Sequence, residues 1–214
     1  MGRQAASNEV KLELKRLALF VDASRAELLS YLEIWHEHSY DAIATERPEC
    51  VVDVGANIGA FSLYQSMVKH AQVVIAFEPS PVVFSRLAKN VEINGLNNVR
   101  IVNAAAGNKP GLLSFSEEPM SVNCRVSESG SLRVPCVTLD AELSNIPVID
   151  ILKIDTEGYE TQVLQGATET LKRTQGVALE LHYPGEREEI ESILFPLGFH
   201  LSKTHGALVF YCRN

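Results

Sequence analysis

The most constraining feature of the sequence is the alternation of short apolar runs with helix-like stretches. Each run lacks a polar side, which is typical of a strand buried on both faces of a parallel sheet. The runs begin at Cys50, Val73, Val99, Ile149 and Val177. The helix-like stretches lie at about 59–70, 80–94, 159–173 and 186–197. This order predicts an open α/β sheet with helices on both faces.

Two segments interrupt or close this pattern. Between residues 111 and 140, short alternating pieces are separated by Ser, Asn and Gly, which predicts an antiparallel excursion instead of a crossover helix. Near the end of the chain, residues 199–203 and 207–212 are apolar pieces joined through His205-Gly206. We expect them to form an antiparallel hairpin that closes the sheet.

The first 47 residues have a different character. Leu12, Leu14 and Leu17 begin an apolar stripe, and Ser24-x-x-Glu27 matches the capping box that starts a helix. We therefore predict helix over residues 8–36. The expected organisation is an N-terminal helical extension at 1–47 followed by one α/β domain at 48–214.

Composition narrows the classes of partner. The chain has 19 Lys and Arg against 27 Asp and Glu, a net charge of −8, so neither a nucleic acid nor an anionic membrane surface is expected to bind. No apolar run suits a membrane helix or a signal peptide, which predicts a cytoplasmic protein. The four cysteines form no C-x-x-C pair, so we expect free thiols instead of a zinc site. A small-molecule partner fits best, and the sequence does not decide between a monomer and a homo-oligomer.

A glycine loop follows the first apolar run. It reads Asp53-Val-Gly55-Ala-Asn57-Ile-Gly59 and leads directly into the next helix-like stretch. Glycine lets the backbone turn sharply and lets a ligand approach it, while the amides of a helix N-terminus can bind an acidic group. A dinucleotide fingerprint would be G-x-G-x-x-G, but this loop is G-x-N-x-G with an acid two residues earlier. Such a loop suits a ligand with its own cation and carboxylate.

A second acid ends the next apolar run. Glu78 lies in Phe77-Glu-Pro-Ser, 25 positions after Asp53, where a carboxylate can accept hydrogen bonds from both hydroxyls of a ribose. Glu78 therefore indicates a nucleoside ligand without choosing between a dinucleotide and S-adenosylmethionine.

Several segments together resemble one family, the FkbM-type S-adenosylmethionine-dependent methyltransferases. The resemblance covers roughly residues 48 to 183, and a Lys-Ile-Asp-x-Glu-Gly-x-Glu block makes it more specific than the glycine loop alone. The segments are Val51-Val-Asp-Val-Gly-Ala-Asn-Ile-Gly, Phe77-Glu-Pro-Ser, Asn103-Ala-Ala-Ala-Gly-Asn, Thr138-Leu-Asp, Leu152-Lys-Ile-Asp-Thr-Glu-Gly-Tyr-Glu and Leu179-Glu-Leu-His.

The resemblance implies a Rossmann-like class I methyltransferase fold, with a mostly parallel seven-stranded sheet, and a cofactor site at its rim. Asp53, Gly55, Asn57 and Gly59 would line the methionine end of the cofactor. Glu78 would hold the ribose, and the segment Asn103-Ala104-Ala105 would run alongside the adenine. The remaining residues expected at this site are Ala56, Pro79 and Asp155. The family's usual reaction is O-methylation of sugars and other natural-product hydroxyls.

Three further polar residues end the last two apolar runs before the hairpin. Asp155, Glu180 and His182 should share one rim with the glycine loop, because parallel strands end on the same side of a sheet. Histidine has a suitable ordinary pKa for a general base that removes the hydroxyl proton, and Asp155 or Glu180 could orient it. We therefore expect this group to be catalytic.

A divalent cation is the alternative role for the same group. Asp155, Glu180 and His182 offer oxygen and imidazole ligands, and some related O-methyltransferases resemble this layout with Mg²⁺ lowering the pKa of the acceptor. Glu160 follows at a helix start, where the helix dipole alone favours an acid, so we expect it to be structural. The other histidines show no ligand spacing and are expected at the surface.

The sequence thus predicts an enzyme that methylates a hydroxyl of a small molecule. A nicotinamide-dependent oxidoreductase and a non-catalytic nucleoside-binding protein are the alternatives. Substrate selection should lie in the N-terminal helices and in residues 111–135. The side chains expected to take part in that excursion are Phe115, Met120, Asn123 and Arg125.

Overall fold

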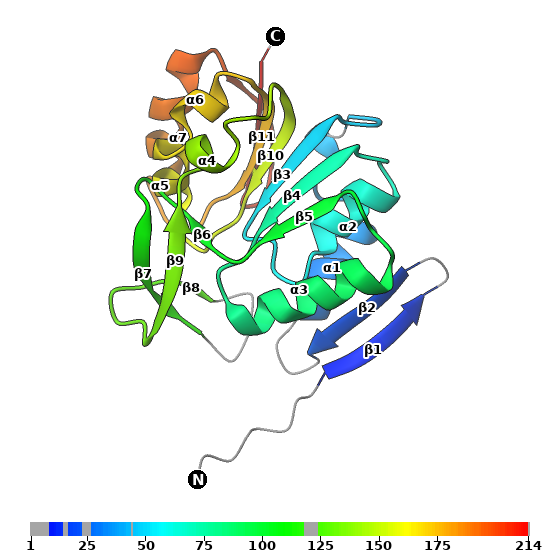
Figure 1. The fold of residues 1–214 in the computed structure, drawn as a ribbon. Helices are drawn as coiled ribbons and strands as arrows, with labels where there is room; N and C mark the ends of the chain where they lie inside the picture. Colours follow the sequence, from blue (N-terminus) through cyan, green and yellow to red (C-terminus); the bar gives the residue numbers. More distant parts are fainter. Residues whose placement is uncertain (1–8, 15–16, 23–26, 44, 118–123, 214) are drawn as a thin grey trace.

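A computed structural model confirms the α/β architecture (Figure 1). It describes residues 9–14, 17–22, 27–43, 45–117 and 124–213. The main sheet has seven strands in the order β12-β13-β11-β10-β3-β4-β5. They are β3 (Cys50–Val54), β4 (Val73–Phe77), β5 (Val99–Val102), β10 (Ile149–Ile154), β11 (Thr174–Glu180), β12 (His200–His205) and β13 (Leu208–Cys212).

Strand directions in this sheet follow the predictions. Neighbours from β5 through β11 are parallel, while β13 is antiparallel to both β11 and β12. The closing hairpin is therefore confirmed. Because all the parallel strands end on one rim, the loops after β3, β4, β10 and β11 meet there.

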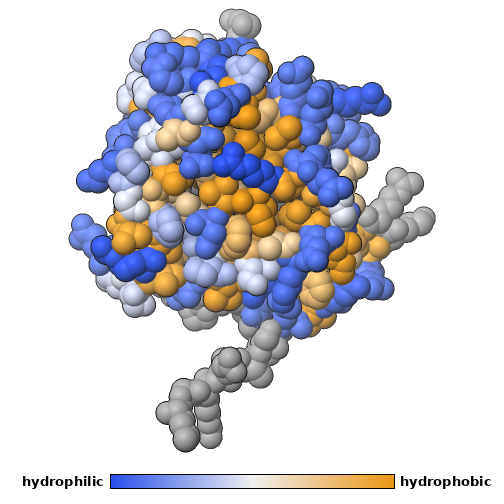
Figure 2. Space-filling view, in the orientation of Figure 1, coloured by the Kyte–Doolittle hydropathy of each residue, from blue (hydrophilic) through white to orange (hydrophobic). Residues whose placement is uncertain are grey.

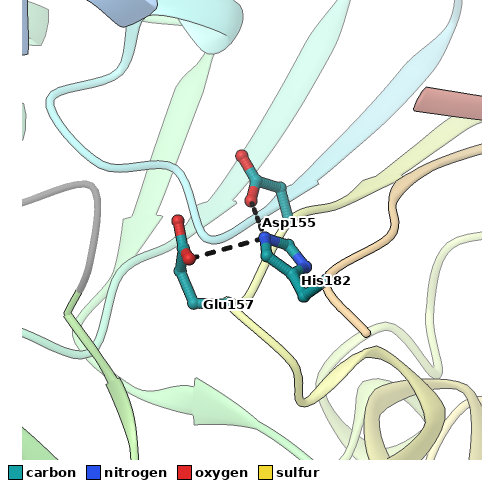
Figure 3. A group of neighbouring side chains, drawn as sticks. All are labelled: Asp155, Glu157 and His182. Atoms are coloured by element: carbon teal, nitrogen blue, oxygen red, sulfur yellow. Dashed lines mark ion pairs between the residues drawn. The ribbon is translucent and has the colours of Figure 1, made fainter. Parts of the chain in front are cut away.

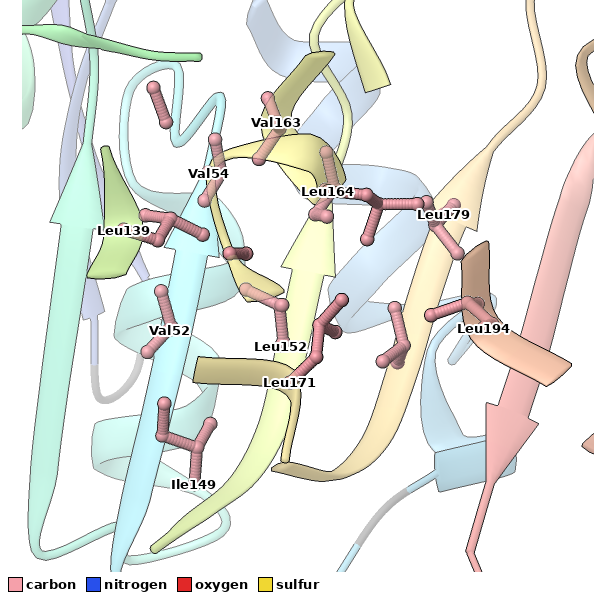
Figure 4. Packing of buried hydrophobic residues seen from close by; sticks show 14 of the residues in the cluster. Val52, Val54, Leu139, Ile149, Leu152, Val163, Leu164, Leu171, Leu179 and Leu194 are labelled. Atoms are coloured by element: carbon pink, nitrogen blue, oxygen red, sulfur yellow. The ribbon is translucent and has the colours of Figure 1, made fainter. Parts of the chain in front are cut away.

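Two layers of helices cover the sheet because its strands are apolar on both sides. Val52 and Val54 face one side and Val51 faces the other, as the period of two requires. Figure 4 shows the first side, where Val52 and Val54 pack with leucines of the short helices. The helices on that side are α4 (Leu139–Glu142), α5 (Glu160–Gln165), α6 (Thr168–Leu171) and α7 (Glu186–Leu194), continued by a 3₁₀ turn, η4 (Phe195–Leu197).

The opposite side of the sheet carries the other helices. Ile34 and Tyr40 pack there with Phe61 and Tyr64 against the sheet. The elements are α1 (Glu27–Trp35), the 3₁₀ turn η2 (Asp41–Ile43), α2 (Ala60–Met67) and α3 (Pro81–Ile93). Figure 2 shows apolar residues gathered in the middle of the viewed face, with hydrophilic residues around them. They lie near the edge of the main sheet where β4 and β5 are the outermost strands (Figure 1). Among the described residues, no helix combines the length and the apolar character needed to cross a membrane.

A small second sheet replaces a crossover helix after β5. Its order is β6-β9-β7-β8, and β7 pairs antiparallel with both β8 and β9, as the sequence predicts. The sequence did not predict β6, which pairs parallel with β9. The strands are β6 (Ala105–Ala106), β7 (Gly111–Ser116), β8 (Arg125–Val126) and β9 (Leu132–Val137).

The prediction of helix over residues 8–36 is wrong in its first half. Residues Glu9–Leu14 (β1) and Leu17–Asp22 (β2) form an antiparallel hairpin, and only α1 is helical. In β1 the apolar residues Val10, Leu12 and Leu14 alternate with charged ones, and β2 buries every second side chain. Ser24 of the expected capping box lies outside the described residues.

Contacts distant in sequence hold β2 in an extended form. The Asn90 side chain on α3 accepts from the Phe20 amide at 2.6 Å and donates to the Phe20 carbonyl at 3.1 Å. Asn94 repeats this pair with the amide and carbonyl of Ala18, at 2.9 and 2.7 Å. Two asparagines thus act as a neighbouring strand for β2, which satisfies backbone groups that a helix would have paired internally.

Candidate active site

A cavity of about 360 Å³ opens at the rim where β3, β4, β10 and β11 end. Most of the predicted site residues line it. These are Gly55, Ala56, Asn57, Glu78, Pro79, Ala104, Ala105, Asp155, Glu180 and His182. Three predicted residues, Asp53, Gly59 and Asn103, lie behind its wall and not in its lining.

Asp53 supports the glycine loop from inside the protein. Its side chain is fully buried, one oxygen accepts from the Ser62 hydroxyl at 2.7 Å, and the other lies 3.2 Å from the Lys153 ammonium. Burying a carboxylate is costly unless such partners are present. Asp53 is therefore held by the protein instead of facing the cavity.

The glycines of the loop are required by packing within the protein. Gly55 has φ +74°, and a Cβ there would stand 1.8 Å from the backbone oxygen of Asp155. Gly59 has φ +91°, and its Cβ would stand 2.5 Å from Leu87. The sequence interpretation assigned this need to the approach of a ligand, whereas the structure shows neighbouring protein atoms at both positions.

Glu78 fixes the loop and also reaches the cavity. Its two oxygens accept from the amides of Asn57 and Ser80, at 2.9 and 2.8 Å. Burial raises the pKa of Glu78 to about 7, although the two amides oppose that shift. Asn103 donates its side-chain amide to the carbonyls of Glu78 and Pro79, so it stabilises the turn after β4.

Lys153 is a site residue to which sequence reasoning gave no role. It is buried on β10, donates to the Gly55 carbonyl at 2.8 Å, and lies 3.2 Å from Asp53 and 3.5 Å from Asp155. Burial would lower the pKa of Lys153, but the two carboxylates raise it above its ordinary value. A lysine within an otherwise apolar strand was the available signal.

His182 lies just beyond β11 among carboxylates (Figure 3). Its Nε2 is 3.5 Å from Glu157 and 3.8 Å from Asp155, and its Nδ1 is 3.3 Å from Glu160. Burial lowers the pKa of His182, but Glu160, Asp155 and Glu157 raise it more, to about 9. The ordinary histidine pKa that we assumed from the sequence therefore does not apply to His182. In the protein without ligand, its imidazole ring is protonated at neutral pH.

Glu160, which we expected to be a structural acid at a helix start, also contacts this histidine. Its side chain is fully buried, and the oxygen beside His182 also accepts from the amide and hydroxyl of Thr156. Buried Glu186 lies close by and accepts from the His182 amide at 2.6 Å. Burial opposes ionisation of Glu160, but its neighbours lower its pKa, while burial and Glu160 raise the pKa of Glu186.

Glu180 shares one cavity with Asp155 and His182, as predicted, but within the described part of the chain it is not grouped with them closely enough to share a cation. Among the described residues, the groups close enough to share a cation are Asp155-Glu157-His182 and Glu160-His182-Glu186. The remaining histidines are exposed, as predicted. Of the four cysteines, Cys50 and Cys136 are buried.

The N-terminal region does line the cavity, through α1. Leu29, Glu33 and Tyr40 contribute to its wall, and none of them had been singled out from the sequence. In the second sheet Phe115 is buried and lines the cavity, whereas Arg125 is exposed and does not. Met120 and Asn123 lie outside the described residues.

Known proteins match both the sequence and the fold. Methyltransferase sdnD of Sordaria araneosa is 28% identical, over 90% of this chain and 89% of that protein. The hexuronic acid methyltransferase AglP of Haloferax volcanii is 29% identical, over 80% of this chain and 76% of that protein. The crystal structure of methyltransferase FkbM from Methylobacillus flagellatus has a TM-score of 0.65 at 16% identity. That likeness covers 85% of this chain but only 47% of the crystal structure.

Residues 53–204, which include the glycine loop, Glu78, Lys153 and His182, match the methyltransferase FkbM domain. This match covers more than half of the chain. The chain therefore belongs to the FkbM family of S-adenosylmethionine-dependent methyltransferases.

Proposed function

We propose that the protein transfers a methyl group from S-adenosylmethionine to a hydroxyl group of a small molecule, such as a sugar. The observation that carries the proposal is one cavity with two unlike ends. The glycine loop and Glu78 lie at one end, and His182 among its carboxylates lies at the other. We name these ends the cofactor side (carboxyl ends of β3–β5) and the acceptor side (carboxyl ends of β10 and β11, with α1).

The cofactor side fits the nucleoside of S-adenosylmethionine. Glu78 uses its oxygens on two amides, but a carboxylate has about four acceptor positions, so capacity remains for the ribose hydroxyls. The Asn57 side-chain oxygen is buried and has no hydrogen-bond partner, as expected for a group that a ligand completes. Ala56, Pro79, Ala104 and Ala105 supply the remaining wall, and Asp155 lies where the two sides meet. Asp53, Gly59 and Asn103 keep this wall in shape.

The acceptor side supplies the proton chemistry. When bound, S-adenosylmethionine provides a methyl group that an oxygen can attack. His182 Nε2 is the proposed acceptor of the hydroxyl proton, and Asp155 and Glu157 hold that nitrogen at the cavity wall. Glu160 fixes the ring from its other nitrogen. Glu180 would contact the acceptor instead of orienting the histidine.

A divalent cation remains the second candidate for this side. Asp155, Glu157 and His182 offer three ligand atoms within 4.8 Å of one another, a set that suits a divalent metal. Loss of activity with EDTA that Mg²⁺ restores would support the metal. Unchanged activity in EDTA would leave His182 as the proposed base.

The sequence alternatives receive less support. A nicotinamide-dependent oxidoreductase and a non-catalytic binding protein do not agree with membership of a methyltransferase family. The net charge of −8 favours a small-molecule acceptor over a nucleic acid.

The decisive experiment measures ligand binding and methyl transfer separately. Calorimetry should show that S-adenosylhomocysteine binds and that NAD does not. Radiolabelled S-adenosylmethionine with a panel of hydroxylated acceptors should then give a labelled methyl ether. Binding of NAD in preference to S-adenosylhomocysteine would contradict the proposal.

A further inference from the structure

Beside the cavity lies a second hollow of about 210 Å³. Glu33, Tyr40 and Glu180 line both spaces, so the hollow continues the acceptor side outward. Glu37 from the end of α1 and His205 from the tip of the closing hairpin extend it. Among the described residues, neither lysine nor arginine lines this second hollow.

Among the described residues, the carboxylates of this hollow (Glu33, Glu37 and Glu180) are not hydrogen-bonded or ion-paired. Glu33 nevertheless lies near both Glu37 and Glu180. Burial raises the pKa of Glu33, and the nearby Glu37 and Asp155 carboxylates raise it further. Burial and Asp155 raise the pKa of Glu180, His182 and Lys153 oppose that shift, and Glu33 adds a smaller increase.

Tyr40 provides an independent sign that a ligand belongs here. Its side chain is only 7% exposed and lines both spaces, yet its hydroxyl has no hydrogen-bond partner among the described residues. Its ring is fixed against Phe61 and Phe210, with centroids 5.1 and 6.3 Å away. The hydroxyl oxygen is not itself closed off from these spaces, so a polar group of a ligand can reach it there.

The order of the strands separates this hollow from the cofactor side. Glu78 follows β4, whereas Glu180 ends β11, and β3 and β10 lie between these strands. Three strand spacings amount to roughly 14 Å. The outer hollow therefore lies toward the acceptor and away from the nucleoside.

We propose that this hollow binds an ammonium group on the acceptor, so that the preferred substrates are amine-bearing polyols, such as amino sugars. The carboxylates of Glu33 and Glu180 would accept hydrogen bonds from the ammonium, and the Tyr40 hydroxyl would contact a neighbouring oxygen. A carboxylate-bearing acceptor would be repelled, which distinguishes this chain from a methyltransferase for hexuronic acid. This inference rests on the proposed function, because it assigns the acceptor of that reaction.

The test first saturates the full-length protein with S-adenosylhomocysteine and then titrates matched hexoses by calorimetry. The probes are D-glucose, its 2-amino, 3-amino and 6-amino deoxy analogues, and D-glucuronate. We expect at least one amino sugar to bind about tenfold more tightly than glucose, since hydrogen bonds to charged groups are the stronger ones. Glucuronate should bind more weakly than glucose. Equal affinity for all five sugars, or none, would overturn the inference.

Variants assign the preference to the hollow. Glu33→Gln with Glu180→Gln should remove the preference for the amino sugar, and Tyr40→Phe should weaken it. The affinity for S-adenosylhomocysteine should stay within about twofold in each. Glu92→Gln changes an exposed acid on α3 and should alter neither affinity. Weaker S-adenosylhomocysteine binding in Glu33→Gln would overturn the inference, because it would place Glu33 at the cofactor. Failure of the unmodified protein to bind S-adenosylhomocysteine would instead contradict the proposed function.

Discussion

Two pairs of acidic residues, one on each side of the cavity, are held differently by the protein. On the cofactor side, Asp53 and Glu78 are buried, and each carboxylate is bound by other groups of the protein. On the acceptor side, Glu33 is exposed and Glu180 is half-buried, and neither has such partners within the described residues. The first pair builds the wall of the cavity, whereas the second pair is free to bind what enters it.

This difference follows from the cost of burying charge. A carboxylate removed from water must gain hydrogen bonds or an ion pair, so Asp53 and Glu78 are fixed before any ligand arrives. A partly hydrated carboxylate needs no such partners. The cofactor side is therefore preorganised for one ligand, while the acceptor side can adapt to its substrate.

The largest effect is expected at the acceptor side. His182→Ala removes the proposed base, so kcat should fall by about 10²–10⁴-fold. The dissociation constant of S-adenosylhomocysteine should stay within about twofold, because His182 lies away from Glu78. Steady-state kinetics and calorimetry measure the two quantities. His70→Ala, at an exposed histidine, is the matched control. A variant with kcat within a few-fold of the unmodified protein would rule out His182 as the base.

Lys153→Met tests how much the buried ion pair between Lys153 and Asp53 contributes to the stability of the protein. It leaves Asp53 without its cation, so the free energy of unfolding should fall by about 3–5 kcal/mol in urea titrations. Adding Asp53→Asn should recover part of this loss, because the buried charge is then removed as well. Glu180→Gln should change stability by no more than about 0.5 kcal/mol. Equal losses in Lys153→Met and Glu180→Gln would contradict the distinction between the two sides.

Glu78→Gln tests ligand binding on the cofactor side. The glutamine side chain keeps one oxygen that can accept from the loop but lacks the carboxylate charge. Calorimetry should therefore show that S-adenosylhomocysteine binds about 1.5–3 kcal/mol more weakly. The preference among hexoses should not change once the variant is saturated with S-adenosylhomocysteine. Unchanged affinity would show that Glu78 supports the loop without binding the ribose.

The sequence brings the segments of the proposed cofactor side to one rim because its signals are local. The alternation of strands and helices, the glycine loop and the strand-final Glu78 each lie within a few consecutive residues. The topology of a parallel sheet then brings these segments to one rim. Even so, a local pattern does not say what surrounds a residue. The loop glycines have protein neighbours where the sequence suggested only a ligand.

The acceptor side is less predictable because its contacts are distant in sequence. The Asn90 and Asn94 side chains that hold β2 extended are at least 70 residues from their partners, so no pattern within residues 8–36 could show them. Glu33 and Tyr40 reach the cavity only because α1 packs beside α2. Glu160 looked like an ordinary helix-start acid until the fold placed His182 against it.

The smallest effect concerns the pH at which the proposed base becomes active. The basic form of His182 appears as pH rises through its pKa of about 9, so kcat/KM should rise with pH through that region. Glu160 raises this pKa most among the carboxylates, and Glu157 contributes less. Glu160→Gln should therefore move the rising limb of the pH profile clearly downward, and Glu157→Gln should move it slightly in the same direction.

The direction of this shift separates a base among carboxylates from a purely structural histidine. Near pH 9 the Glu157 carboxyl is ionised, since burial raises its own pKa only to about 7. Replacing it with glutamine thus removes one negative charge 3.5 Å from Nε2 and makes the protonated imidazole less favourable. The histidine then loses its proton at lower pH, and the rising limb must follow if His182 is the base. A limb that does not move in either variant, while thermal melting shows both to be folded, would mean that another group accepts the proton.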